Sequence, residues 1–164
     1  MIKMLRIDDR LIHGQVAVIW SKNLNVSRIM VISNEVSKNE VQKSALKMAA
    51  PENIKTFISP VDKALKILND PRAKNLSILV VMNNPEEVKE VCEGLNDEAK
   101  PEILDVANYG RIAGNLDNKR KISDTVYLTD EEEKIFKELS NEGFKFIYRP
   151  LPSDTAKDFD KLLK

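Results

Sequence analysis

The sequence is poor in cysteine, histidine and glycine, with one, one and five of these among its 164 residues. Because Cys92 is alone, neither a disulfide framework nor a thiolate metal site is available. No stretch approaches the roughly 20 apolar residues that a transmembrane helix needs, and the N-terminus shows no signal-peptide pattern. Acidic and basic residues balance at 26 each, so no bulk charge recruits nucleic acid or an anionic membrane surface. We therefore expect a globular cytoplasmic protein that has no nucleic acid among its partners.

Strand-like apolar runs alternate with helical patterns along the whole chain. The expected strands are Ile2–Asp8, 26–33, 54–58, 77–82, 102–107, 125–128 and 145–148. The expected helices begin at residues 14, 37, 60, 84, 129 and 153, and the last of them runs to 163. This alternation predicts one α/β domain over residues 1–164, with three layers: a mostly parallel central sheet of about seven strands and helices on both of its faces.

Apolar residues at helical spacing indicate which side of each helix faces the core. Ser37 and Glu40 have the spacing of a capping box for the second helix, and Thr129 and Glu132 have the same spacing before the fifth. Cys92 falls on an apolar stripe and is expected to be a small core residue. Other residues assigned to the core in this way include Val16, Ile19 and Trp20; Val41, Ala45, Met48 and Ala49; and Ala156, Phe159, Leu162 and Leu163.

His13, the only histidine, lies between the first expected strand and the first expected helix. Gly14 follows at once and removes the Cβ atom that would crowd an incoming anion. Arg10 lies three residues earlier, within reach of the same loop, and the apolar Leu11 and Ile12 can anchor that loop in the core. This setting favours a chemical role for His13 over that of an ordinary surface histidine.

The start of a helix attracts anions, because its first N–H groups and the positive end of its dipole point toward them. The expected phosphate-binding groups are therefore the N–H groups of Gly14 and Gln15 and the guanidinium of Arg10, with His13 as the nucleophile. A free imidazole is largely neutral at cytoplasmic pH and can attack phosphorus without a strong base. Because phosphoryl transfer mainly needs positioning and charge neutralisation, no metal and no cofactor are expected.

Asp8 and Asp9 follow the first strand, and we expect them to pair with Arg6 and Arg10 and so to hold the guanidinium groups in place. An acidic pair at this point is also typical of a receiver domain. That fold needs an aspartate at the end of the third strand, and the sequence there ends in Ser59. A single histidine beside two carboxylates does not make a closed metal shell.

The loop that follows the expected strand 102–107 contains Asn108 and Gly110. In parallel sheets, ligands gather at the carboxyl ends of the strands. We therefore expect this loop to lie at the same edge of the sheet as the His13 loop. A dinucleotide site is not expected, because it would need G-x-G-x-x-G after the first strand and Gly14 stands alone there.

Residues 6–16, which read RIDDRLIHGQV, and the following Trp20 resemble the signature of the IIB subunit of the mannose/fructose/sorbose class of the bacterial sugar phosphotransferase system. The resemblance extends to residues 41–51, 126–129 and 149–152. The family usually has an Asn-x-Gly-Gly loop after its fifth strand. Here Asn108 and Gly110 are kept, but Tyr109 and Arg111 replace smaller or apolar residues.

The resemblance implies that His13, at its Nδ1 atom, accepts a phosphoryl group from a phosphohistidine of a IIA protein. His13 then passes the group to a sugar held by the membrane IIC/IID complex, and Arg10 matters most for that delivery. The chain would be a sugar phosphotransferase that associates peripherally with the permease. A second copy of the chain stays open as a partner, and so does a regulatory relative that docks partners without turnover; phosphorylation of His13 separates the latter from a carrier.

Overall fold

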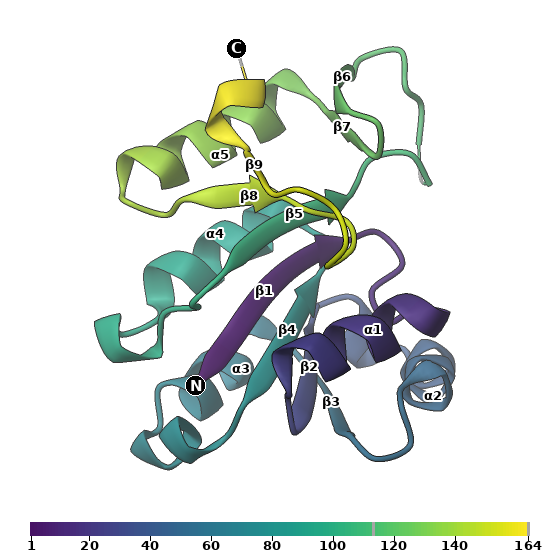
Figure 1. The fold of residues 1–164 in the computed structure, drawn as a ribbon, viewed down its shortest axis with the longest axis vertical. Coiled ribbons are helices and arrows are strands. Elements are labelled where there is room, and N and C mark those ends of the chain that lie inside the picture. Colours follow the sequence, from purple (N-terminus) through teal and green to yellow (C-terminus); the bar gives the residue numbers. More distant parts are fainter. Residues whose placement is uncertain (113, 164) are drawn as a thin grey trace.

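The computed structural model describes residues 1–112 and 114–163. A seven-stranded sheet in the order β3-β2-β4-β1-β5-β8-β9 runs through the molecule, and all of its pairs are parallel except β8 with β9 (Figure 1). The α/β class and the mostly parallel sheet are thereby confirmed. The sheet strands are β1 (Ile2–Asp8), β2 (Arg28–Ile32), β3 (Lys55–Ser59), β4 (Ile78–Met82), β5 (Leu104–Asn108), β8 (Phe146–Tyr148) and β9 (Lys157–Asp158).

Helices cover both faces of this sheet, as predicted. The α-helices are α1 (Gly14–Leu24), α2 (Glu40–Ala49), α3 (Val61–Leu68), α4 (Pro85–Gly94) and α5 (Asp130–Asn141), and the 3-10 helices are η1 (Val36–Lys38), η2 (Pro71–Asn75), η3 (Asp97–Ala99) and η4 (Asp160–Leu162). One apolar cluster joins the sheet to α1 and α2, and a second, larger one joins it to α3, α4 and α5. Because β1 lies in the middle of the sheet, paired with β4 and β5, the loop that follows it starts from a buried strand.

The predicted strand at 125–128 exists but lies outside the central sheet. It forms β7 (Val126–Leu128), which pairs with β6 (Arg120–Ser123) in a separate antiparallel hairpin. A single parallel bridge between Tyr109 and Val126 joins this hairpin to the end of β5. The central sheet still has seven strands, because β9, which was not predicted, is part of it in place of β7.

The predicted helix at 153–163 is wrong. Lys157 and Asp158 instead pair with Tyr148 and Ile147 as strand β9, and only the short turn of η4 follows. Phe159 is fully buried with its ring 5.3 Å from that of Phe136, and its N–H donates to the Phe146 carbonyl. Pairing with β8 gives the backbone of this segment hydrogen-bond partners, and the aromatic contact buries Phe159; an exposed helix here would bury less apolar surface.

The predicted inner face of α1 is right for Val16 and Trp20 but wrong for Ile19, and the predicted inner face of α2 is wrong. On α1, Ile19 is 41% exposed, and Ala17 and Ser21 join Trp20 against the sheet. On α2, Val41 and Met48 are 81% and 87% exposed, and Ala45 and Ala49 are exposed as well. Leu46 is the residue of this helix that packs against the core cluster, which also contains Val36 of η1. The cap of α2 also differs, since the Asn39 side chain, rather than Ser37, accepts the Gln42 N–H.

Other local predictions are confirmed. Thr129 and Glu132 form the capping box of α5. Cys92 is fully buried on α4, and burial raises the pKa of its thiol to about 12, so the group behaves as part of the core. Within the described ranges, no helix is both long enough and apolar enough to cross a membrane.

Candidate functional site

His13 stands at the junction between the sheet and α1. β1 ends at Asp8, the chain turns with the Leu11 N–H donating to the Asp8 carbonyl at 2.9 Å, and His13 is the N-terminal cap residue of α1. Leu11 and Ile12 are only 8% and 4% exposed, so they anchor the loop as predicted. His13 is half-buried, and within the described part of the chain its side chain makes no capping bond to the helix. The position of the imidazole is therefore set by the backbone of this turn and not by a capping bond.

Gly14 opens the space in front of the helix. Its φ of +44° lies in the left-handed region, and a Cβ atom built on it would meet nothing within 4 Å. Gly14 and Gln15 are both exposed. Because the first N–H groups of a helix have no acceptor one turn earlier, these two groups can point to an anion beside His13.

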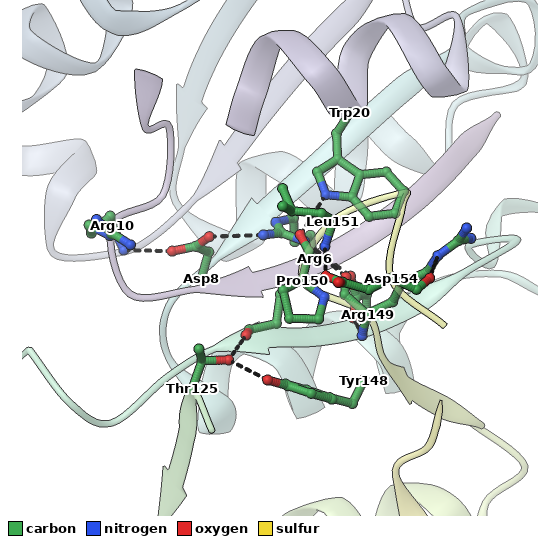
Figure 2. A network of polar contacts seen from close by, with 12 residues as sticks. Arg6, Asp8, Arg10, Trp20, Thr125, Tyr148, Arg149, Pro150, Leu151 and Asp154 are labelled. Atoms are coloured by element: carbon green, nitrogen blue, oxygen red, sulfur yellow. Dashed lines mark hydrogen bonds and ion pairs between the residues drawn. The ribbon is translucent and has the colours of Figure 1, made fainter. Parts of the chain in front are cut away.

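A buried arginine lies beneath the loop. Arg6 of β1 is 4% exposed, and its guanidinium bridges the Asp8 carboxylate at 3.2 Å and the Asp105 carboxylate at 3.1 Å. Asp8 in turn accepts the backbone N–H of Arg10 at 3.1 Å, as Figure 2 shows. The predicted pairing of Arg6 with Asp8 is thus confirmed, whereas Asp8 holds the backbone of Arg10 and not its guanidinium.

Among the residues that the structure describes, Asp9 forms no ion pair with an arginine, which corrects the prediction. Its carboxylate accepts the Gly110 N–H at 2.8 Å, and its own N–H donates to the Asn108 carbonyl at 2.8 Å. Burial raises the pKa of Asp9, although the backbone N–H groups of residues 110–112 act in the opposite direction. The N–H groups of the loop after β5 point to this carboxylate. The loop therefore lies beside the His13 loop, at the sheet edge where it was predicted.

Arg10 is exposed at this junction, and Asn108 reaches its side chain. With the Asn108 amide oriented so that both of its ends find partners, its oxygen accepts from the Arg10 guanidinium at 3.1 Å and its nitrogen donates to the Thr125 carbonyl at 3.3 Å. Asn108 is only 7% exposed. It therefore fixes one side of the guanidinium and leaves the rest of the group facing solvent.

Gly110 has a structural role that only glycine can fill. Its φ is +89°, and a Cβ atom on it would lie 2.0 Å from the carbonyl oxygen of Tyr127. That carbonyl belongs to the backbone of β7 and has little room to move. The glycine thus allows the loop after β5 to seat against the hairpin while its N–H reaches Asp9.

We expect Gly110→Ala to lower the free energy of unfolding by about 2–6 kcal/mol, since a strained backbone and forced overpacking cost about 1–3 kcal/mol each. Gly114→Ala is the matched control. Its φ is +85°, but its Cβ atom would meet nothing within 4 Å, so it carries only the backbone part of the cost. Urea unfolding of both variants measures the difference. Equal losses would show that the contact with Tyr127 is harmless.

Asp105 and the contacts of Trp20 and Arg149, which close the back of the site, were not predicted from the sequence. Asp105 is fully buried in β5, and its other oxygen accepts the Arg149 N–H at 2.9 Å. Trp20 donates from its indole nitrogen to the Pro150 carbonyl at 2.9 Å, and its ring lies 5.6 Å and 5.8 Å from the Arg6 and Arg149 guanidinium carbons (Figure 2). One signal was present in the sequence: a charged residue in the middle of an otherwise apolar strand is rarely placed there without a partner.

The comparisons with known proteins agree with this arrangement. The model of the family described as the PTS system sorbose subfamily IIB component matches residues 2–164. The chain is 38% identical to a probable phosphotransferase enzyme IIB component of Streptococcus pyogenes serotype M6, with 99% of each protein covered. It is 36% identical to the sorbose-specific EIIB component of Lacticaseibacillus casei, with 96% of the chain and 92% of that protein covered.

A solved structure gives the same result. The IIBSor domain of the sorbose permease from Klebsiella pneumoniae matches with a TM-score of 0.89 and 27% identity, covering 99% of this chain and 95% of that one. The fold, the family model and the relatives therefore agree. The chain belongs to the sorbose subfamily of IIB components, within the mannose/fructose/sorbose family, and is a phosphoryl-transfer component of the phosphotransferase system.

Proposed function

We propose that His13 carries a phosphoryl group from a phosphohistidine of a IIA component to a sugar bound by the membrane IIC/IID components. The placement of the single imidazole carries this proposal. It is half-buried at the start of α1, is not used as a cap, and is flanked by the open backbone of Gly14 and by the segment of Arg10. The chain would work at the cytoplasmic face of a permease, without a metal ion or another cofactor.

Two displacements at phosphorus make up the proposed cycle. In the loading step, a nitrogen of His13 attacks the phosphorus, the P–N bond to the donor imidazole breaks, and its electron pair stays on the donor nitrogen. In the delivery step, a sugar hydroxyl attacks the phosphorus, the P–N bond to His13 breaks, and its electron pair returns to the imidazole nitrogen. The hydroxyl proton passes to water or to a base of the membrane components. In both steps charge lies on the equatorial oxygens, where the Arg10 guanidinium and the N–H groups of Gly14 and Gln15 would neutralise it.

Intact mass measurement tests the loading step. The purified chain is incubated with phosphoenolpyruvate, enzyme I, HPr and the IIA component encoded beside it. We expect a gain of one acid-labile phosphoryl group and no gain in a His13→Ala chain. An unmodified wild-type chain next to a visibly phosphorylated IIA component would reject the proposal and leave a regulatory docking domain as the better explanation.

Delivery needs a second assay because it involves a different partner. The loaded chain, freed from IIA, is mixed with membrane vesicles that contain the IIC/IID components, and the sugar phosphate formed in one turnover is measured. Mannose, fructose and sorbose are supplied in turn, since these sugars appear in the names of the relatives. A loaded chain that transfers to none of them and only hydrolyses would count against delivery to a sugar of these kinds.

A further inference from the structure

Asp105 is the least expected charged group in the molecule. It lies in the second position of β5, pairs in register with Arg6 of β1, and is completely buried. Burying a carboxylate costs several kcal/mol, and pairing it with one arginine does not reliably repay that cost. Apolar residues of similar volume often give an equally stable or a more stable core. The stability of the sheet alone therefore gives no reason for a charge at this position.

A short series of contacts leads from Asp105 to the segment beside His13. Asp105 accepts from one terminal nitrogen of Arg6 at 3.1 Å, and the other terminal nitrogen of Arg6 donates to Asp8 at 3.2 Å. The second oxygen of Asp8 then holds the backbone N–H of Arg10 at 3.1 Å. Arg6, Asp8 and Asp105 are at most 4% exposed, so water hardly competes with these bonds.

Asp105 also anchors the C-terminal part of the chain. Its other oxygen accepts the Arg149 N–H at 2.9 Å, and the Arg149 carbonyl accepts from Arg6 at 3.4 Å. Figure 2 shows Arg149 and Pro150 of this segment near Arg6, with Trp20 above them. The planar guanidinium of Arg6 is thus fixed from two sides, by β5 and by the segment after β8, before it meets Asp8.

We propose that Asp105 is a positioning residue for phosphoryl transfer, which acts on Arg10 through Arg6 and Asp8. When Arg6 is held in one rotamer, its bond to Asp8 holds that carboxylate in place. Asp8 in turn binds the Arg10 N–H, and this orients the backbone from which the Arg10 side chain extends. A misplacement of about 1 Å in a group that neutralises transition-state charge can cost about 100-fold in rate. This inference rests on the proposed role of His13 and assigns a further residue to it.

Asp105→Asn tests the idea, because it keeps the shape of the side chain and removes its charge. The single-turnover delivery rate should fall about 10- to 100-fold, while the IIA concentration that half-saturates loading stays unchanged. Asp154→Asn is the matched control. Asp154 accepts the Leu151 N–H at 2.9 Å in the same C-terminal segment but does not touch the Arg6 bridge, so its delivery rate should match the wild type.

A double variant separates positioning from a general structural role. If Asp105 acts through Arg10, then Asp105→Asn should lose nearly all of its effect on delivery when it is added to Arg10→Ala. Multiplied losses in the double variant would overturn the proposal, and so would an unchanged delivery rate in a folded Asp105→Asn chain. A wild-type chain that cannot be loaded at all would instead reject the role of His13.

Asp8→Asn provides a second route if Asp105→Asn does not fold. It interrupts the same series of contacts one step nearer to Arg10 and should show the same lack of additivity with Arg10→Ala. If the losses of delivery rate from Asp8→Asn and Arg10→Ala multiply in the double variant, Asp8 does not act through Arg10, and the proposal fails.

Discussion

An Arg10→Ala chain should still take up a phosphoryl group from IIA but should deliver it to sugar about 10²–10³-fold more slowly, by analogy with the loss of one transition-state donor. A protein donor can bring groups that already neutralise the phosphoryl oxygens, whereas a sugar hydroxyl brings no positive charge. Delivery therefore depends more on the guanidinium that Asn108 holds at the mouth of the site. The loading and delivery assays described above measure the two steps separately.

Two further variants show whether geometry or charge matters at this position. Arg10→Lys keeps the charge but loses the planar fork, so its delivery rate should fall between those of the wild type and Arg10→Ala. Arg72→Ala removes an exposed arginine that pairs with Asp70 far along the chain from the site, and it should change neither step. If Arg10→Ala could not be loaded, the division of labour between the two steps would be wrong.

The His13 loop could be predicted from the sequence because its signals are local. A strand that ends in a turn, a glycine next to the imidazole and a helix directly after it follow one another within a few residues. The alternation of strands and helices along the chain likewise predicted the parallel sheet. Parallel order then brought the end of β5 beside the end of β1, so the loop with Asn108 and Gly110 lies at the edge of the His13 loop as expected, where Gly110 contacts Asp9.

The remaining parts of the site depend on contacts between distant residues. The bridge between Arg6 and Asp105 requires β5 to lie next to β1 in one particular register, and no local pattern contains that information. The contact of Trp20 with Pro150 arises in the same way. On α2 the local pattern was misleading: Val41 and Met48 have the spacing of a core face but are exposed, and Leu46 packs against the cluster instead.

Replacing Arg6 by methionine should produce a large loss of stability. The side chains are similar in length, but Asp8 and Asp105, both buried, would lose the guanidinium that each pairs with. Removing one partner of a buried ion pair costs about 3–5 kcal/mol, so a domain of ordinary stability would be close to unfolding. Urea unfolding measures the loss. A second change, Asp105→Leu, should recover part of it, since one uncompensated carboxylate is then gone.

The loss from Arg6→Met should also depend on pH in a defined direction. Burial raises the pKa of Asp105 to about 7 even with Arg6 acting to lower it, against about 4 in an unfolded chain. Between these values the folded state binds more protons, so stability falls as the pH rises through this window. Without Arg6 the pKa of Asp105 should rise further. Arg6→Met should therefore destabilise the chain more at pH 8 than at pH 5. An equal loss at both pH values would mean that removing Arg6 does not raise the pKa of Asp105.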